Sequence, residues 1–545
     1  MINRKLLLAV IFSLLINTCF ADKYPRNYNI DIQHYAFELT LSDNSDLIIG
    51  RTTIQVMFRT TDVKQLRLDL VNTTDLRKGK GMEVDSVTYN NKCVEFMHEN
   101  DVLFIKLPGG IEKNKLYSFV VYYKGIPADG LRIGATRYGD RSFFNENWPN
   151  RTRHWLPTVD HPYDKATSEF IVTAPSHYKV VSNGLLMEES ILNKEQKLTH
   201  WKQSVPVSSW LFVLGVCDFA VQYVDQFEGK SIQTWVYSKD REAGFYDFAS
   251  PTKQVLEFYS AYVGPFAYEK MASIQTPSVN GGMETSSAIF YGEAMINGKR
   301  DNRLRNVVIH ELAHQWFGNA VTESTWDDAW LSEGFATYFT LLFQESAYGH
   351  DEYVDGLKKA RKTVLDFYKK DSVFKIVDDR TAELGPVTNE MTYQKGAWFL
   401  HMLREKMGHE NFQKGIRSYY QKYFNANAST SDLMAEMQQF SKEELQGFFN
   451  QWLNRADVLK INGAWEYDST SKQVIINLEQ IQSSGFVFDM PVEFQLVDAE
   501  GKTSLQKVSL KTKTAEFRIN AAQKPVALVM DPRTVLLGEM NIACK

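Results

Sequence analysis

The feature of this 545-residue sequence that most restricts its fold is a change in the period of its hydrophobic residues. From about Tyr28 to Phe219, apolar and polar residues alternate over short stretches such as 35–41 and 115–123. Alternation of this kind is typical of β-strands with one buried face. After Phe219 the pattern changes, over a mixed stretch, to apolar residues spaced three and four apart, which predicts helices. These helical segments are 302–318, 327–347, 391–407, 410–424 and 442–455.

Strand-like runs return after Gly463, at 473–478, 492–496 and 505–510. A chain of this length also exceeds what a single hydrophobic core organises. We therefore expect a multidomain α+β protein. Its parts would be an N-terminal, largely antiparallel β domain over residues 22–219, a helical domain over 220–456 and a C-terminal β-sandwich over 457–545.

Residues 1–21 have the composition of a secretory signal peptide. Arg4 and Lys5 precede an apolar run over 6–16, and the small residue Ala21 fits a cleavage site. The run is shorter than the roughly 20 residues that a membrane span needs. We expect an exported protein, periplasmic or secreted, with no stable membrane span in the mature chain. An uncleaved N-terminal anchor is the alternative, and lipid attachment at Cys19 is disfavoured by the two polar residues before it.

Charge and cysteine content exclude some other classes. The net charge is −5, and lysines and arginines are spread along the chain, so the sequence lacks the basic stripe of a nucleic-acid-binding protein. Cleavage of the signal peptide would leave Cys93, Cys217 and Cys544, an odd number in no metal-binding spacing. We expect neither a disulfide framework nor a cysteine metal site, and the sequence carries no signal for an oligomeric state.

A catalytic motif lies within the first long helical segment. His310 and His314 are four residues apart in the pattern H-E-x-x-H, with Glu311 next to the first histidine. Residues four apart on a helix lie on one face, so both imidazoles can bind one metal ion, while Glu311 stays beside it without ligating it. The alternative is an ordinary helix with exposed histidines.

A catalytic zinc ion requires a third protein ligand and leaves one position open. The metzincin pattern is excluded, because Phe317 and Ala320 occupy the positions of its glycine and third histidine. Glu333, nineteen residues after His314 on the next helical segment, would return to the histidines if the two helices pack antiparallel across a turn near 322–325. The spacing predicts one zinc ion, with Glu311 as the general base that activates water for hydrolysis.

At this point the sequence resembles the aminopeptidase N family of gluzincin zinc metallopeptidases. The resemblance covers nearly the whole mature chain and rests on several stretches in order: 155–157 with 160–162, 281–284, 310–319, 326–335 and 393–397. It implies a thermolysin-like helical catalytic domain and peptide substrates with a free N-terminus. It also implies that Glu284, in the loop Gly281-Gly282-Met283-Glu284, binds the substrate α-amine and that Tyr393 donates to the oxyanion.

Three departures from the family pattern bear on these expectations. Thr285 stands where the family loop usually ends in asparagine. In the N-terminal domain Glu146 is a candidate second anchor for the substrate amine, but Trp148 occupies a position where a carboxylate or amide is common. The sequence also stops after the expected β-sandwich, without the large C-terminal helical domain of longer members, so we expect a more open cleft.

Two other activities and one non-catalytic role compete with the aminopeptidase hypothesis. A related gluzincin endopeptidase would not need Glu284, and its third-ligand segment normally has asparagine where this chain has Ser332. An epoxide hydrolase of the same superfamily is the second alternative. A catalytically silent peptide-binding protein is the third, but binding alone requires neither Glu311 nor Tyr393.

Overall fold

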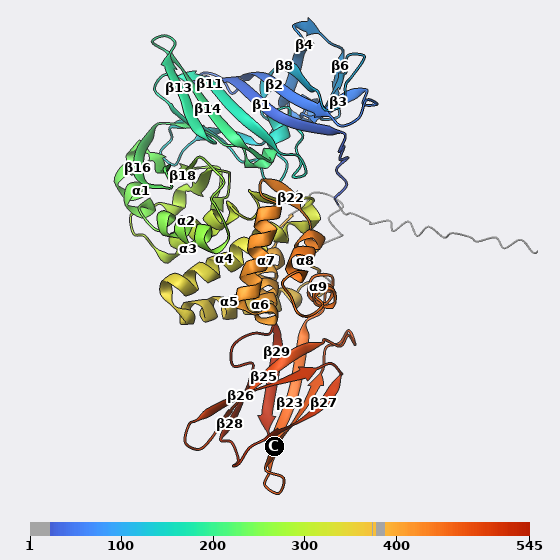
Figure 1. The fold of residues 1–545 in the computed structure, drawn as a ribbon. Coiled ribbons are helices and arrows are strands. Elements are labelled where there is room, and N and C mark those ends of the chain that lie inside the picture. Colours follow the sequence, from blue (N-terminus) through green and yellow to red (C-terminus); the bar gives the residue numbers. More distant parts are fainter. Residues whose placement is uncertain (1–21, 373, 378–386) are drawn as a thin grey trace, which may run out of the picture.

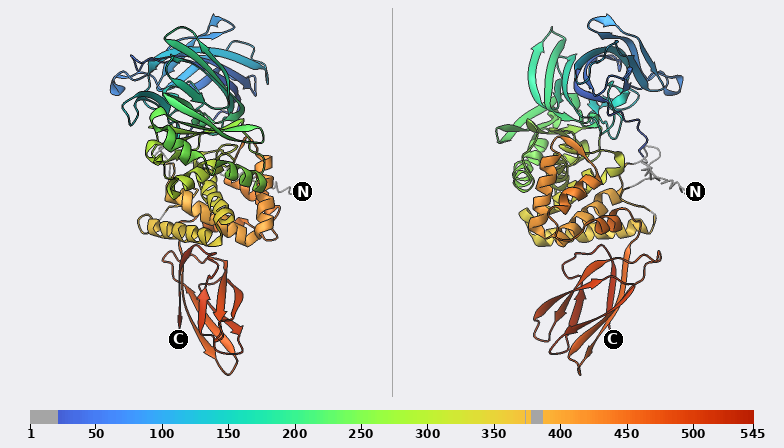
Figure 2. Two further views of the ribbon diagram at one scale, coloured as in Figure 1. Left: turned by 90° about the vertical axis from the view of Figure 1, so that its left-hand side faces the viewer. Right: turned by 45° about the vertical axis from the view of Figure 1, so that its right-hand side comes forward.

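The computed structural model describes residues 22–372, 374–377 and 387–545, so the expected signal peptide lies outside the described residues. Three tiers follow one another along the chain: an N-terminal β region, a helical region and a C-terminal β region (Figure 1). Two further views show the same stacked arrangement (Figure 2). The expected fold class is confirmed.

An eight-stranded sheet dominates the N-terminal region. Its strands, in spatial order, are β13 (Leu185–Ile191), β14 (Gln196–Val207), β11 (Ala166–Pro175), β1 (Ile30–Thr40), β2 (Ile48–Phe58), β8 (Leu116–Ile126), β4 (Gly81–Tyr89) and β5 (Lys92–Cys93). The sequence alternation is reproduced in β1, where Tyr35, Phe37 and Leu39 are buried and the intervening residues are only partly buried. One pair departs from the antiparallel expectation, because β1 and β11 run parallel.

Two smaller sheets complete this region. A four-stranded sheet contains β12 (Lys179–Ser182), β15 (Leu214–Cys217), β10 (Arg141–Asn145) and β9 (Leu131–Ala135), and a three-stranded sheet contains β3 (Gln65–Asp69), β7 (Val102–Lys106) and β6 (Phe96–Glu99). Glu146 follows β10 directly, and the carbonyl oxygen of Asn145 accepts a hydrogen bond of 3.2 Å from Ser278 Oγ of the middle tier.

A five-stranded mixed sheet links the first tier to the helices. Its strands, in order, are β16 (Phe219–Phe227), β17 (Lys230–Tyr237), β18 (Lys270–Thr276), β20 (Ala288–Gly292) and β19 (Gly282–Met283). The short edge strand β19 pairs antiparallel with β20 and belongs to the loop that contains Glu284. This sheet occupies the stretch that the sequence pattern left mixed.

The helices of the middle tier are α1 (Arg241–Phe248), α2 (Thr252–Tyr262), α3 (Asn302–His314), α4 (Trp330–Tyr348), α5 (His350–Tyr368), α6 (Gly396–Met407), α7 (His409–Lys422), α8 (Thr430–Gln438) and α9 (Gln446–Leu453). Each predicted helical segment contains a helix, with different ends. The predicted turn between the first two segments also contains a strand, β21 (Val321–Glu323), which pairs in parallel with β22 (Ala426–Ala428). A π-helix (Met391–Lys395) precedes α6 where a continuous α-helix was expected.

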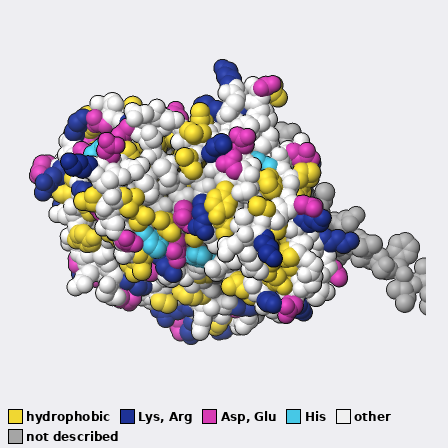
Figure 3. Space-filling model, turned by 90° about the horizontal axis from the view of Figure 1, so that it is seen from above, with side chains coloured by type: hydrophobic (Ala, Val, Ile, Leu, Met, Phe, Trp, Pro, Cys, Tyr) yellow, Lys and Arg dark blue, Asp and Glu magenta, His cyan; other side chains and the backbone are white. Residues whose placement is uncertain are grey.

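Two facing sheets form the third tier. One contains β27 (Thr514–Asn520), β24 (Gln473–Gln480), β23 (Leu459–Asp468) and β29 (Gly538–Cys544), and the other contains β26 (Thr503–Leu510), β25 (Met490–Val497) and β28 (Ala527–Met530). The domain boundaries drawn from the sequence stay predictions. Seen from above, the surface carries basic and acidic side chains interspersed with apolar ones (Figure 3).

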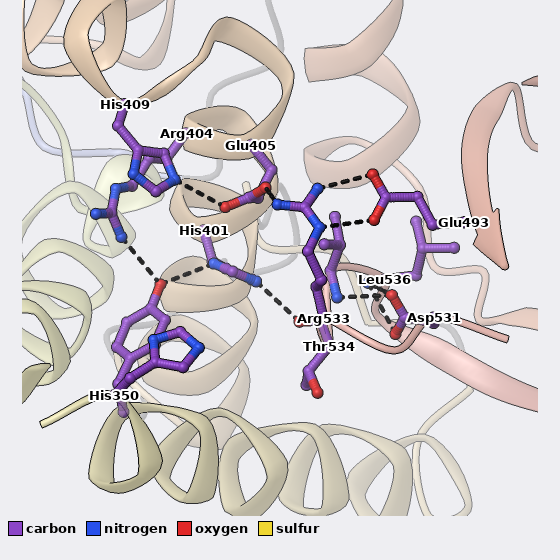
Figure 4. A network of polar contacts seen from close by, with 12 residues as sticks. His350, His401, Arg404, Glu405, His409, Glu493, Asp531, Arg533, Thr534 and Leu536 are labelled. Atoms are coloured by element: carbon purple, nitrogen blue, oxygen red, sulfur yellow. Dashed lines mark hydrogen bonds and ion pairs between the residues drawn. The ribbon is translucent and has the colours of Figure 1, made fainter. Parts of the chain in front are cut away.

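Polar contacts, some of them buried, join α6 to the C-terminal sheets (Figure 4). His401 Nε2 lies 2.9 Å from the carbonyl oxygen of Thr534. Arg533 donates two hydrogen bonds of 2.7 Å to Glu493 and pairs with Glu405 at 3.0 Å. Bidentate pairing fixes the angle between the two groups as well as their distance. These contacts tie the β-sandwich to the helix that follows Tyr393.

Candidate active site

The two histidines of the motif lie on the last turns of α3. The helix begins after Asp301, whose side chain accepts a hydrogen bond of 2.9 Å from the backbone nitrogen of Leu304, so one free donor of the first turn is capped. His310 and His314 follow one turn apart, and their Nε2 atoms lie 3.1 Å from each other. Helical spacing alone therefore brings two potential ligand atoms together.

Glu333 of α4 completes a triangle of ligand atoms. Its Oε2 atom lies 3.3 Å from His310 Nε2 and 3.2 Å from His314 Nε2. Atoms that bind one tetrahedral zinc at about 2.0–2.2 Å are roughly 3.3–3.5 Å apart, so these separations suit such an ion. Burial would raise the pKa of Glu333, but the two histidines outweigh it and lower the pKa to about 2. Two imidazoles and one carboxylate form a donor set that fits zinc.

Contacts behind His314 orient its ring. Its Nδ1 atom lies 3.2 Å from the carbonyl oxygen of Phe317 and 3.0 Å from Ser332 Oγ. Because a carbonyl oxygen only accepts, Nδ1 carries a hydrogen, and Nε2 is the ring nitrogen that faces Glu333 and can bind a metal ion once it has lost its proton. Gly318 has a φ of +107°, and a Cβ there would lie 2.2 Å from Ser332 Oγ. The supporting roles of Ser332 and Gly318 were not predicted from the sequence.

The electrostatics of this cluster favour a cation. Burial would lower the pKa of His314, but the charges of Glu284 and Glu333 prevail and raise it to about 10. Glu284, Glu311 and His314 also bring side-chain ligand atoms within 4.8 Å of one another. A buried group of carboxylates is stable only when positive charge is present among them. The site therefore attracts protons or a metal ion.

Glu311 lies beside the ligand triangle, as its place in the motif requires. Burial, together with the charge of Glu284, raises its pKa well above the ordinary value. A Cβ on Gly282 would lie 2.2 Å from Glu311 Oε1, so only glycine in β19 leaves room for this carboxylate. A raised pKa suits a group that must take up a proton from water and release it again.

The loop of Glu284 is held by the residues that follow α3. The side chain of Glu284 is 6% exposed, and burial raises its pKa to about 7. Its carbonyl oxygen accepts hydrogen bonds from Gln315 Nε2 at 3.1 Å and from Asn319 Nδ2 at 2.5 Å. The hydroxyl of Thr285 donates to Ala288 within the loop. The supports from Gln315 and Asn319 were also missed, although both lie within the family stretch 310–319.

Tyr393 approaches the site from the π-helix before α6. Its ring is nearly parallel to that of His310, with the centroids 6.0 Å apart and an angle of 22° between the planes. Burial, reinforced by the charge of Glu333, raises its pKa well above the ordinary value, so the hydroxyl keeps its proton. Single π-helical turns are frequent at functional sites. This hydroxyl is a neutral donor next to the proposed metal position.

Glu146, unlike the other candidate site residues, forms an ion pair with a nearby arginine. It pairs with Arg151 and accepts a hydrogen bond of 3.1 Å from the backbone nitrogen of Trp148. Burial raises its pKa to about 7, against the influence of Arg151. Trp148 packs edge-on against Trp210 and Trp326, with centroids 4.9 and 4.8 Å away. The tryptophan at this position therefore serves the packing between the first and second tiers.

Two family models match this chain. The model of the peptidase M1 N-terminal domain matches residues 25–211, and that of the peptidase family M1 domain matches residues 248–452. Together they cover more than two thirds of the chain.

Several relatives are named as aminopeptidases. Glutamyl aminopeptidase of Rattus norvegicus is 25% identical over 85% of this chain and 51% of its own length. Glutamyl aminopeptidase of Homo sapiens is 31% identical over 64% of this chain and 38% of its own length. The chain thus spans about half, or less, of the length of these relatives.

A solved structure resembles most of this chain and is matched over nearly all of its own length. A mutant of the M1 zinc metallopeptidase of Deinococcus radiodurans, bound to a Tyr-Ser-Ala substrate, is 25% identical with a TM-score of 0.66, and the match covers 78% of this chain and 94% of that one. With the ligand triangle, the neighbouring carboxylates and both domain matches in agreement, the chain belongs to the M1 peptidase family, the aminopeptidase N group of zinc metallopeptidases.

Proposed function

We propose that this protein is a zinc-dependent aminopeptidase that removes the N-terminal residue from peptides. The observation that carries the proposal is the convergence of His310 Nε2, His314 Nε2 and Glu333 Oε2, 3.1–3.3 Å apart, beside the buried carboxylate of Glu284. The names of the relatives support a peptide-bond hydrolase of this kind.

One zinc ion would be held by His310, His314 and Glu333, and when bound it would polarise the scissile carbonyl and lower the pKa of a water molecule. Glu311 would accept the proton of that water and pass it to the leaving nitrogen, for which its raised pKa is suited. The Tyr393 hydroxyl would donate a hydrogen bond to the oxygen that becomes negative during attack. A donor of this kind contributes roughly 3 kcal/mol.

Glu284 would bind the ammonium group of the substrate. Gly281, Gly282 and Met283 would form the floor of the cleft next to it. A Cβ on Gly281 would meet no atom within 4 Å, so there is room at this position for a peptide backbone. An anchor one residue from the scissile bond restricts cleavage to N-termini. Glu146 stays a proposed second anchor, and its pairing with Arg151 makes it the weaker of the two.

We also propose that the protein is exported, to the periplasm or outside the cell. The basic residues and short apolar run of residues 1–21 support this proposal. Among the described residues, none of the helices has the length and apolar character needed to cross a membrane.

Four rates test the aminopeptidase assignment: native enzyme and Glu284→Ala, each on a peptide with a free and with an acetylated N-terminus. A carboxylate paired with a partly desolvated ammonium contributes roughly 1.5–3 kcal/mol, and the acetylated peptide leaves Glu284 facing an uncharged amide. Native enzyme should therefore cut the blocked peptide roughly 10- to 150-fold more slowly. Glu284→Ala should narrow this gap by slowing only the free peptide.

Glu257→Ala, which alters an exposed glutamate of α2, is the matched control and should leave all rates unchanged. Internal cleavage of blocked peptides by the native enzyme at a comparable rate would replace the assignment with an endopeptidase.

A further inference from the structure

The first described residue, Asp22, is buried at the boundary between the first and second tiers. Only 7% of its surface is exposed. Its Oδ2 atom lies 2.5 Å from His161 Nε2 and accepts a hydrogen bond of 3.4 Å from the backbone nitrogen of Trp326. Burial would raise the pKa of Asp22, but His161 outweighs it, and the pKa is below its ordinary value. The side chain is thus a fixed, charged contact.

The backbone nitrogen of Asp22 faces a second carboxylate. It lies 3.2 Å from Oδ1 and 3.5 Å from Oδ2 of Asp327. Asp327 belongs to the short turn Trp326–Asp328 that leads into α4, the helix of Glu333. A peptide N–H has one hydrogen and no net charge, whereas an α-ammonium group has three hydrogens and a full charge. Two carboxylate oxygens at these distances suit the ammonium group better.

The sequence independently predicts that the chain is cut just before Asp22. Ala21 is the small residue at the end of the predicted signal peptide, so cleavage there makes Asp22 the first residue of the mature chain.

We propose that an export peptidase hydrolyses the Ala21–Asp22 bond and that Asp327 binds the α-ammonium group this creates. The hydrolysis consumes one water molecule, leaves a carboxylate on Ala21 and a protonated amine on Asp22, and requires no other reactant. The inference rests on the proposed export and is independent of the peptidase activity.

Binding of the new N-terminus by Asp327 would connect the first residues of the mature chain to both the N-terminal β region and the helical region. The Tyr24 ring stacks on His161, with centroids 4.5 Å apart and planes 21° apart, and its hydroxyl donates to Asp69 of β3. In Figure 1 this dark-blue stretch runs from the N-terminal β region down beside the helical region. Asp22 therefore links the N-terminal region to the turn before α4, and processing adds an ion pair to that link.

The first test is the mass of the intact protein after secretion from an exporting host. The expected mass is that of a chain that starts at Asp22. A start at any other residue overturns the proposed site.

The second test compares the melting temperature of chains that start at Asp22, released from a cleavable fusion, with chains that carry Gly-Ser before Asp22. The extension keeps every side chain and converts the ammonium into an amide. It should lower the melting temperature of the native sequence by about 1–3 °C, the size expected for one partly buried ion pair in a large domain. In Asp327→Asn protein the extension should lower the melting temperature by less than half as much as in the native sequence.

The matched control is Asp351→Asn, which alters an exposed aspartate in the first turn of α5. In this variant the Gly-Ser extension should lower the melting temperature as much as in the native sequence. If Asp327→Asn does not fold, Asp327→Glu, which keeps the charge, must still show a loss on extension. The proposed ion pair is overturned if the extension lowers the melting temperature equally in the native and Asp327→Asn proteins. It is also overturned if the extension does not lower the melting temperature of the native protein. Both readouts are independent of catalysis, so a failed aminopeptidase assignment would leave them interpretable.

Discussion

Gly334 of α4 and Gly396 of α6 face each other so closely that a Cβ on Gly334 would lie 2.9 Å from the Gly396 Cα atom. The two helices meet backbone to backbone at this point. Glu333 is adjacent to one glycine, and the π-helix of Tyr393 ends next to the other. The pair of glycines therefore sets how near the third metal ligand lies to the proposed oxyanion donor.

Gly334→Ala should separate these helices. Overpacking of a tight contact costs about 1–3 kcal/mol, so the free energy of unfolding should fall by that amount, and zinc should bind more weakly because Glu333 moves with the backbone. Denaturant unfolding and a competitive zinc titration measure the two effects. Gly447→Ala in α9, where a Cβ would meet no atom within 4 Å, is the control and should be neutral or slightly stabilising. If the two variants had the same free energy of unfolding and the same zinc affinity, the contact between Gly334 and Gly396 would not hold Glu333 in place.

Glu311→Gln should retain zinc but lose turnover, because the ligands remain while the general base is gone. A decrease of at least about 100-fold is expected. Metal analysis should find one zinc per chain in both the native and variant proteins, and a chelator should abolish native activity. Active enzyme with less than about a tenth of an equivalent of zinc would contradict the metal assignment.

Tyr393→Phe should lower kcat by roughly 100-fold or more with a smaller change in KM, since the hydroxyl meets charge that exists only in the transition state. Steady-state kinetics on an aminoacyl-amide substrate separates the two constants. Tyr246→Phe, at a half-exposed tyrosine of α1, provides the comparison and should change neither. A higher KM at unchanged kcat would indicate that Tyr393 binds the ground state instead.

Acidification should weaken the contact between α6 and the C-terminal sheets through His401. Burial lowers the pKa of this histidine to about 4, below the unfolded value of about 6.5. The unfolded chain then binds more protons between these values, so stability is complete above about pH 6.5 and falls, by up to about 3 kcal/mol, as the pH drops to about 4.

Denaturant unfolding at pH 7.5 and 4.5 measures this loss. His401→Gln cannot take up a proton, but its amide can still donate to the Thr534 carbonyl and accept from the Tyr353 hydroxyl, so the loss should shrink. His350→Gln, at an exposed histidine, serves as the control. An unchanged pH dependence in His401→Gln would place the acid sensitivity elsewhere.

Much of the ligand set was predictable because its geometry is local. The four-residue spacing of His310 and His314 brings their rings together on any regular helix, whatever the rest of the fold. The alternating pattern likewise identified strands such as β1 and β8, since one face of each packs into a core. The parallel pairing of β1 with β11 was not predictable, because the pattern reports which face is buried and not which strand lies alongside.

The supports of the site are contacts between distant segments. Gln315 and Asn319 hold the carbonyl of Glu284, which lies about 30 residues earlier, and no periodic pattern marks such a pair. Glu146 illustrates a different limit, since its partner Arg151 is close in sequence but no pattern marks the pair, which competes with the role that the resemblance implied. The roles of the individual site residues stay predictions.

The sequence by itself determined which side chains could form a zinc site and on which helices they lie, because residue identity and helical spacing are local properties. The tertiary structure decided whether these helices approach closely enough to use them. The distance between these helices is set by three features: the contact of Gly334 with Gly396, the pairing of β21 with β22 and the π-helical turn at Tyr393. Such distances depend on how backbones pack across hundreds of residues, and packing of this kind leaves no periodic signal in the chain.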